Sequence, residues 1–316
     1  MPFGTAVAVL AVVMFGQVPG EGRWASELSN FAHAPAFAIV TLTVIALLRR
    51  APVRPVSALR EYSLAIGVSL LLGALVELLQ LMTGRDASCD DLLRDALGAL
   101  AATGFLAVTD PKVRVLPSRR LLQRIGLLVG VTSTAIIIAP LAITGTAYLQ
   151  RHRNFPTLVD FSSPVGTYFL GAYSAVTVQR ERLPIVLASD GEEAVGLHAR
   201  LQGNNGWGLA LWEPYPDWRG YDSLALDLAN PTGATLLLRV RIRDHSQRNQ
   251  RQAGYFGMIT IPPRSRRTWT IPLEHLAAAA GRAYVNTTNV HSLVLTRDPA
   301  NRAQEFYLMR IWLMRD

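Results

Sequence analysis

Long apolar runs occupy the first half of the chain, and short alternating patterns occupy the second. Five stretches approach the roughly 20 apolar residues that a membrane-spanning helix needs. They lie at about residues 3–19, 32–48, 62–82, 92–109 and 125–148. The first lacks the basic n-region of a signal peptide, and Gln17–Gly20 is a poor cleavage site, so we expect it to be retained as a helix. The pattern predicts five transmembrane helices.

Strict alternation of apolar and polar residues begins after Tyr148. Leu224, Leu226 and Leu228 alternate with smaller or polar residues, and the arginines at 239, 241 and 243 alternate with aliphatic ones, as in half-buried strands. Further strands are expected near 194–201, 207–212, 255–261, 268–273, 291–297 and 305–313. Many short strands separated by turn residues predict an all-β sandwich of the jelly-roll type.

The basic residues divide the chain into domains and orient it in a membrane. Arginines and a lysine gather in the loops at 49–60 and 110–124, which the positive-inside rule places in the cytoplasm. The amino terminus is then cytoplasmic, and residues 150–316 lie outside a bacterial inner membrane that the chain crosses several times. We expect a four-helix membrane domain at 1–115, a basic loop and fifth helix at 116–149, and a β-sandwich at 150–316.

Composition excludes several classes of function. The net charge of +8 is explained by the loop arginines, so nucleic acid is not an expected partner. The only cysteine, Cys89, rules out an intrachain disulfide. No P-loop, GxGxxG, HExxH or nucleophile-elbow motif is present, and we expect neither a cofactor nor a metal.

Ionisable residues between the third and fourth apolar stretches form the leading candidate site. Each such residue costs roughly 2.5 to 3.5 kcal/mol within hydrocarbon, so these residues require a polar cavity, a partner or a function. Residues three or four apart share a helix face, which brings the group together near the outer leaflet. The candidate catalytic residues are His33, Glu77, Arg85, Asp91 and Asp95, and the candidate binding residues are Gln80 and Ser88.

Structural interpretations of the same residues remain open. Ser88 and Asp91 fit a helix-capping pattern, and Asp90 favours the positive end of the helix dipole. Glu77 and Arg85 could form an ion pair across the turn at Gly84. If the group acts in chemistry, Arg85 offers a fork for a phosphate or carboxylate, and neighbouring carboxylates suit acid and base roles. A divalent cation is disfavoured, since the ligand spacing matches no known metal site.

The residues of this group also carry a family resemblance. His33, Glu77-x-x-Gln80, Gly84-Arg85-x-Ala87-Ser88-x-x-Asp91-Leu-Leu and Gly98 occur in the order found in the VanZ-like membrane family. That family is named for a protein associated with glycopeptide resistance, and the resemblance covers residues 1–115. It implies a helical membrane domain with these residues in its site, and leaves the reaction open.

The second half of the chain resembles galactose-binding-like jelly rolls of the carbohydrate-binding-module kind. The resemblance rests on the stretch from Trp218 to Leu228, on 241–244 and on a closing strand at 306–308, and covers residues 158–316. It implies aromatic platforms beside polar groups. The candidate binding residues are Trp212, Tyr215, Trp218, Arg241, Arg243 and Asp244. Alternatively, Trp218 belongs to the core and the arginine stripe is a solvated face.

These patterns give two hypotheses of function. The first is an envelope protein whose helices bind or process a lipid-linked glycan, or another envelope intermediate, at the outer leaflet, with a β-domain that contacts polysaccharide such as exopolysaccharide. The alternative is a non-enzymatic protein whose helices only anchor a glycan-binding or protein-binding module. Whether the chain is an enzyme stays open. A transporter is disfavoured because no inverted repeat or paired broken helices are evident.

Overall fold

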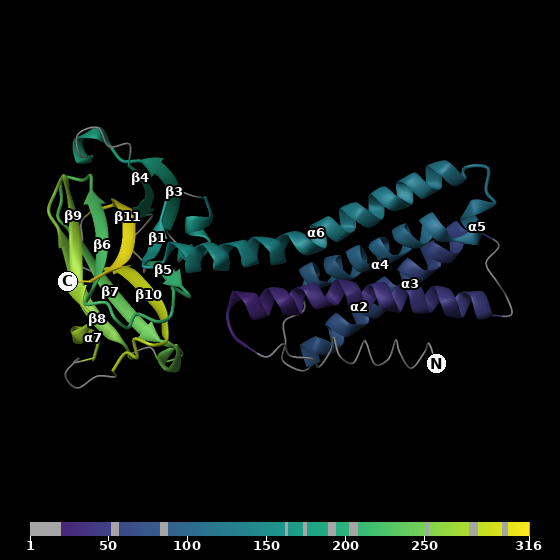
Figure 1. Cartoon of the computed structure of the whole chain (residues 1–316), viewed down its shortest axis with the longest axis horizontal. Helices are drawn as coiled ribbons and strands as arrows, with labels where there is room; N and C mark the ends of the chain where they lie inside the picture. The colour runs from purple at the N-terminus through teal and green to yellow at the C-terminus, as the bar shows by residue number, and fades with distance from the viewer. Residues whose placement is uncertain are drawn as a thin grey trace. The chain divides into compact units, whose positions relative to one another are not determined.

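The computed structural model describes most of the chain. The described residues are 20–51, 57–82, 88–161, 164–172, 176–188, 194–201, 208–248, 250, 253–277, 284–298 and 303–315. The chain divides into two compact units, Met1–Thr146 and Ala147–Asp316. The first is helical and the second is built from β-strands (Figure 1).

Four helices in the described part of the chain are long and apolar enough to cross a membrane. They are α2 (Arg23–Arg50), α3 (Ala58–Met82), α4 (Cys89–Thr109) and α6 (Arg119–Asn154), with the short α5 (Pro111–Arg114) before α6. They coincide with the last four predicted spans. Five long apolar helices were predicted, and the structure describes four. The predicted segment at 3–19 lies outside the described residues.

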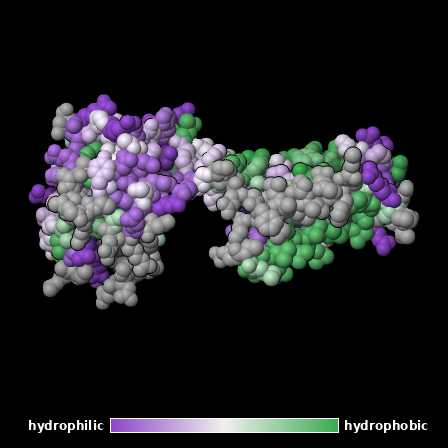
Figure 2. Space-filling model, turned by 90° about the horizontal axis from the view of Figure 1, so that it is seen from below, coloured by the Kyte–Doolittle hydropathy of each residue, from purple (hydrophilic) through white to green (hydrophobic). Residues whose placement is uncertain are grey.

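Small residues let these helices pack closely. A Cβ atom added at Gly98 of α4 would lie 2.1 Å from the carbonyl oxygen of Ala34 in α2. A Cβ at Gly104 of α4 would lie 2.6 Å from the carbonyl oxygen of Gly126 in α6. Since a side chain at either glycine would separate the backbones, these positions hold α4 against both neighbours. The surface seen in Figure 2 is predominantly hydrophobic on this unit and mostly hydrophilic on the β unit.

The β unit is a sandwich of two antiparallel sheets. The six-stranded sheet has the order β3-β4-β11-β6-β9, with β1 also paired to β11, and the five-stranded sheet has the order β2-β5-β10-β7-β8. The strands are β1 (Thr157–Asp160), β2 (Leu170–Ala172), β3 (Val176–Arg182), β4 (Val195–Leu201), β5 (Gly208–Trp212), β6 (Ser223–Asn230), β7 (Leu236–Asp244), β8 (Tyr255–Ile261), β9 (Ser265–Pro272), β10 (Val290–Arg297) and β11 (Glu305–Met314). The predicted β-sandwich is confirmed.

The core follows directly from the alternation seen in the sequence. Inward-facing leucines of β6 and β7, such as Leu226 and Leu238, are fully buried between the sheets. The last turns of α6 contribute as well, because Ala147 lies in the same core and Tyr148 packs against it. The outward faces of the two sheets therefore carry the residues available for function.

Candidate functional site

Three residues form one row on the outer face of the five-stranded sheet. Trp212 and Arg243 are predicted binding residues, and Ser292 was not predicted. Ser292 of β10 is paired in register with Arg243 of β7 on one side and with Trp212 of β5 on the other. Directly paired residues of antiparallel strands point to the same face. Leu211, Ile242 and Leu293, their neighbours along the strands, belong to the core, so this row faces outward.

Trp212 lies across a position without a side chain. A Cβ added at Gly171 of β2 would be 2.9 Å from the indole Nε1, so the indole occupies the space that a side chain there would fill. The ring of His291 lies 6.1 Å from the indole, and the ring of His245 lies 5.3 Å from His291. Burial, followed by the proximity of His245 and Arg243, lowers the pKa of His291.

Two arginines of β7 hold the connection to β8. Arg241 donates from Nη2 to the carbonyl oxygens of Gln250 (2.6 Å) and Ala253 (2.9 Å), and its guanidinium lies 5.0 Å from the centre of the Phe256 ring. Arg243 donates from Nη1 to the carbonyl oxygen of Arg248 at 2.9 Å. These contacts link β7 to Arg248, Gln250 and Ala253.

Two polar atoms on this side of the sheet lack a hydrogen-bond partner among the described residues. Nε of Arg243 and Oγ of Ser292 are buried atoms without a hydrogen-bond partner among the described residues. A buried polar atom without a partner costs about 1–3 kcal/mol, so such atoms point to a ligand group or an ordered water. The half-buried Trp212 indole and the Arg243 guanidinium suit sugar rings, which offer an apolar face for stacking and hydroxyls for hydrogen bonding, whereas the Ser292 hydroxyl is 0% exposed.

Three residues predicted for glycan binding have other roles. Trp218 is 0% exposed and donates from Nε1 to the carbonyl oxygen of Tyr215, so it is a core residue and its predicted binding role is wrong. Tyr215 packs its ring against Phe155, with 4.1 Å between ring centres. Asp244 is buried and accepts hydrogen bonds from Ser246 and from the Asn286 amide, which makes it a structural residue and not a surface contact.

The helical unit brings together part of the predicted polar group. Nδ1 of His33 in α2 lies 3.1 Å from Oδ1 of Asp95 in α4, and both residues are buried. Glu77 of α3 accepts a hydrogen bond from the Ser88 amide at 2.7 Å, whereas its Oε1 is buried without a partner among the described residues. Gly73 makes room for the pair, because a Cβ there would lie 2.8 Å from Oδ2 of Asp95.

The remaining members of the group have local roles or lie elsewhere. Ser88 caps α4 by accepting from the Asp90 amide, as the sequence indicated. Asp91 forms an ion pair with Arg94 at 2.6 Å, and Gln80 is buried in α3. Arg85 lies outside the described residues. Within the part of the chain that is described, no group of three or more His, Cys, Asp and Glu could hold a metal ion.

Sequence reasoning missed a charge network at the other end of the helices. Arg49 of α2 donates to Glu61 of α3 at 3.0 Å and also to Asp110, which follows α4. Asp110 accepts from the Tyr62 hydroxyl, and Lys112 pairs with Glu61. The carboxylates of Glu61 and Asp110 are fully buried. The signal available in the sequence was an acid, Glu61, at the start of an apolar stretch beside a basic loop.

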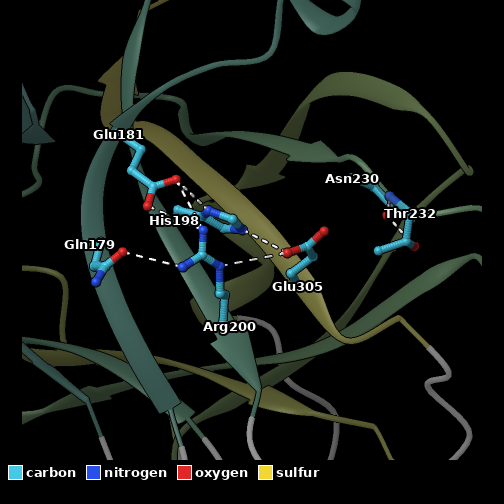
Figure 3. Close-up of polar contacts among 7 residues, drawn as sticks. All are labelled: Gln179, Glu181, His198, Arg200, Asn230, Thr232 and Glu305. Atoms are coloured by element: carbon cyan, nitrogen blue, oxygen red, sulfur yellow. Dashed lines mark hydrogen bonds and ion pairs between the residues drawn. The ribbon is translucent and has the colours of Figure 1, made fainter.

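A second missed cluster lies on the outer face of the six-stranded sheet (Figure 3). The His198 ring has Glu181 at 2.8 Å from Nδ1 and Glu305 at 3.0 Å from Nε2, and it stacks on Tyr307 with 4.2 Å between centres. Arg200 reaches both glutamates and Gln179. Both ring nitrogens of His198 are therefore engaged by glutamates. The cluster links the strands β3, β4 and β11. Alternation of His198 and Arg200 with Leu197 and Ala199 was the available signal.

Solved structures provide likenesses to about half of the chain. A family 11 carbohydrate-binding module from Clostridium thermocellum, in complex with a β-1,3-1,4-mixed-linked tetrasaccharide, is 18% identical with a TM-score of 0.38, and the match covers 50% of this chain and 94% of that one. An exo-β-agarase is 16% identical with a TM-score of 0.42, over 51% of this chain and 25% of that one. The CBM22-1 xylan-binding domain from Paenibacillus barcinonensis is 11% identical with a TM-score of 0.31, over 46% and 86%. The sugars named are ligands of those proteins.

Comparisons of sequence identify no relative. No family model matches the chain, and membership of the VanZ-like family therefore stays a prediction. No curated protein matches it either. Within its described residues the structure shows a helical region with four apolar candidate spans, followed by an antiparallel β-sandwich.

Proposed function

We propose that this chain is a membrane-anchored glycan-binding protein of the bacterial cell envelope. The helices anchor it in the inner membrane, and the jelly-roll sandwich presents the outer face of its five-stranded sheet to polysaccharide. The row of Trp212, Ser292 and Arg243 carries this proposal, because it combines a stacking surface with two polar atoms, Nε of Arg243 and Oγ of Ser292, that have no hydrogen-bond partner among the described residues. Phe256, which is 46% exposed on the same face, extends the surface toward β8.

A more specific function is favoured by the polar group of the helices. His33 and Asp95 form a buried pair, and Oε1 of Glu77 is buried without a hydrogen-bond partner among the residues that the structure describes. Such groups within spans are usually functional. The proposal is that they contact the head of a lipid-linked glycan at the outer leaflet.

The glycan proposal is tested with the fragment 147–316 on a panel of envelope glycans, with titration calorimetry of any hit. Removing the indole with Trp212→Ala should weaken binding roughly tenfold or more, since base or sugar stacking on an aromatic ring contributes on the order of 1–3 kcal/mol. Trp312 provides the matched control, because it is half-buried on the outer face of the other sheet. Trp312→Ala should leave binding unchanged.

A second variant separates positioning from contact. Gly171→Val keeps the Trp212 side chain but fills the space in which the indole lies. The indole should be displaced, and binding should fall although Trp212 is retained. Far-ultraviolet circular dichroism and the melting temperature report whether the fold survives. Saturable binding that is insensitive to both variants, or a panel without any hit, would show that this face does not bind glycan.

The more specific function is tested in the full-length protein. Glu77→Gln and Asp95→Asn preserve shape and remove charge, so both should abolish complementation of a deletion strain while membrane levels stay normal. Normal complementation by the double variant would leave the helices as an anchor only.

A further inference from the structure

A long apolar groove runs between three of the candidate spans. It has a volume of about 620 Å³ and is lined by α2, α4 and α6. Ala38 and Leu42 contribute from α2, Ala102 and Phe105 from α4, and Ile137 and Ile138 from α6. A groove of this size and composition lies within the range of ligand sites and suits a hydrocarbon chain.

A second pocket, with a mixed apolar and charged lining, adjoins the groove. This pocket has a volume of about 230 Å³ and shares Phe31 and Ile137 with the groove, so the two are contiguous. Its polar lining residues are Glu27, Asn30, Asp90 and Arg94. An apolar groove beside a pocket with charged residues suits an amphipathic ligand, whose hydrocarbon chain would lie in the groove and whose head would lie in the pocket.

The groove is separate from the His33–Asp95 pair. Ala34 and Gly98, one residue after His33 and three after Asp95, line the groove, whereas Asp95 lies against Gly73 of α3. The pair therefore faces α3, and the groove faces α6. The two features lie on different sides of the α2–α4 pair and can be altered independently.

The charges of the pocket select the head of the ligand. The carboxylates of Glu27 and Asp90 form no hydrogen bond or ion pair with any described residue, although the Asp90 backbone amide donates to Ser88. Arg94 uses Nη1 to pair with Asp91, and its other guanidinium nitrogens have no partner among the described residues. Two acids without a basic partner attract an ammonium group, and the remaining guanidinium donors suit a phosphate. A purely anionic head would meet the repulsion of both acids.

We propose that this groove and pocket bind a zwitterionic lipid whose head joins a phosphate to a primary ammonium group, as in phosphatidylethanolamine. One hydrocarbon chain lies along the groove, the phosphate contacts Arg94, and the ammonium contacts Glu27 and Asp90. The proposal rests on insertion of the helices in a membrane, and it is independent of glycan binding by the sandwich. It gives the helices a lipid-binding role beyond anchorage.

The probe experiment uses the full-length protein in detergent and native mass spectrometry. Phosphatidylethanolamine, phosphatidylcholine and phosphatidylglycerol with identical chains are added one at a time. Phosphatidylethanolamine should bind about tenfold more tightly than phosphatidylglycerol, since one charge-assisted hydrogen bond corresponds to roughly that ratio. Phosphatidylcholine should be intermediate, because its quaternary ammonium carries charge but cannot donate a hydrogen bond.

Paired variants locate the lipid. Glu27→Gln should remove most of the preference for phosphatidylethanolamine, whereas Glu274→Gln, at a fully different and exposed site in the sandwich, should not. Ala38→Phe fills the groove and should reduce retention of all three lipids by about tenfold. Ala135→Phe makes the same change on α6 at an exposed residue outside the groove and should leave retention intact.

Three outcomes would overturn the proposal. Equal binding of phosphatidylethanolamine and phosphatidylglycerol would show that the pocket does not select a zwitterionic head group. Unchanged retention in Ala38→Phe would remove the assigned groove. A concentration-dependent dimer that disappears in Ala38→Phe, without bound lipid in the wild type, would show that a second copy of the chain occupies the groove. Glycan binding by the fragment 147–316 is unaffected by each of these results, so the two proposals fail separately.

Discussion

At the residue scale, Asn230 shows how much structure one buried amide can hold. It ends β6 and is 0% exposed. Its Nδ2 donates to the carbonyl oxygens of Ala234 (2.8 Å), Ile261 (3.2 Å) and Pro262 (3.0 Å), while its Oδ1 accepts from Thr232. The contact with Thr232 is visible in Figure 3. This side chain therefore joins the β6–β7 turn to the end of β8.

Replacing this donor with an acceptor should be severe. Asn230→Asp would set a carboxylate against three carbonyl oxygens and should lower the free energy of unfolding by about 3 kcal/mol or more. Asn286 is the matched control, since it is exposed and its side chain uses only Oδ1, which accepts from Thr288. Asn286→Asp should change stability by less than about 0.5 kcal/mol. Urea unfolding of the fragment 147–316 measures both, and equal effects would contradict this account of Asn230.

Residue roles were the least predictable part of the sequence. Trp212 and Trp218 are both tryptophans near the end of β5, and nothing in the local pattern distinguishes a half-buried surface ring from a core ring. Part of the difference arises from a distant chain segment, because the backbone amide of Trp218 donates to the carbonyl oxygen of Thr287. His33 and Asp95 were predictable, since charged residues in apolar stretches require partners.

At the element scale, the His198 cluster joins three strands through their side chains. Whichever ring nitrogen of His198 carries a proton, a glutamate oxygen accepts it, from Glu181 of β3 or Glu305 of β11. The hydrogen bond from His198, followed by the charge of Arg200, lowers the pKa of Glu181. Ionised Glu181 therefore stabilises the attachment of the edge strand β3.

This lowered pKa predicts an acid-sensitive edge. A carboxyl whose folded pKa is depressed contributes stability above its unfolded value near 4.5, and that contribution is lost as the pH falls through the folded value. Between about pH 6 and pH 3, the urea midpoint of the fragment 147–316 should fall more steeply in the wild type than in Glu181→Gln. Glu274→Gln should retain the wild-type slope. A steeper slope in Glu181→Gln would reverse the sign of the assigned interaction.

Elements with a regular period were predictable, and short or irregular ones were not. Strands β4 to β11 follow the alternation of the sequence. Strands β1 and β2 have four and three residues, too few to show a period. Strand β3 ends in Gln-Arg-Glu-Arg, and its polar residues on both faces hide the alternation. The network of Arg49 and Asp110 was hidden for another reason, since its charges also satisfy the positive-inside rule.

At the scale of the whole molecule, the division of the chain falls within a continuous helix. The boundary between the two units lies between Thr146 and Ala147, eight residues before α6 ends at Asn154. Within the β unit, the Tyr148 ring packs edge-on against Phe169 at 5.2 Å, and Arg151 donates to the carbonyl oxygen of Glu213 at 2.7 Å. The sandwich therefore includes the last two turns of α6, and a boundary predicted at residue 150 leaves Ala147 and Tyr148 out.

A fragment that retains these turns should be the more stable one. Residues 147–316 should melt at a higher temperature than residues 156–316, because the shorter fragment exposes the core that Ala147 and Tyr148 cover. Within the longer fragment, Tyr148→Ala should cost about 2–4 kcal/mol, whereas Leu149→Ala, at a 47% exposed neighbour on the same helix, should cost little. Identical melting of the two fragments would show that α6 only links the units.

Cys89 gives this chain a built-in reporter of membrane topology. It is the only cysteine of the sequence, and it is exposed at the first residue of α4. A membrane-impermeant maleimide added to spheroplasts should therefore label the unmodified protein at a single position if the start of α4 faces outward, and Cys89→Ser should abolish the signal. Labelling only after lysis would reverse the predicted orientation. The neighbouring Asp90 lines the proposed lipid pocket. An environment-sensitive dye on this thiol would therefore report lipid entry through a change in fluorescence.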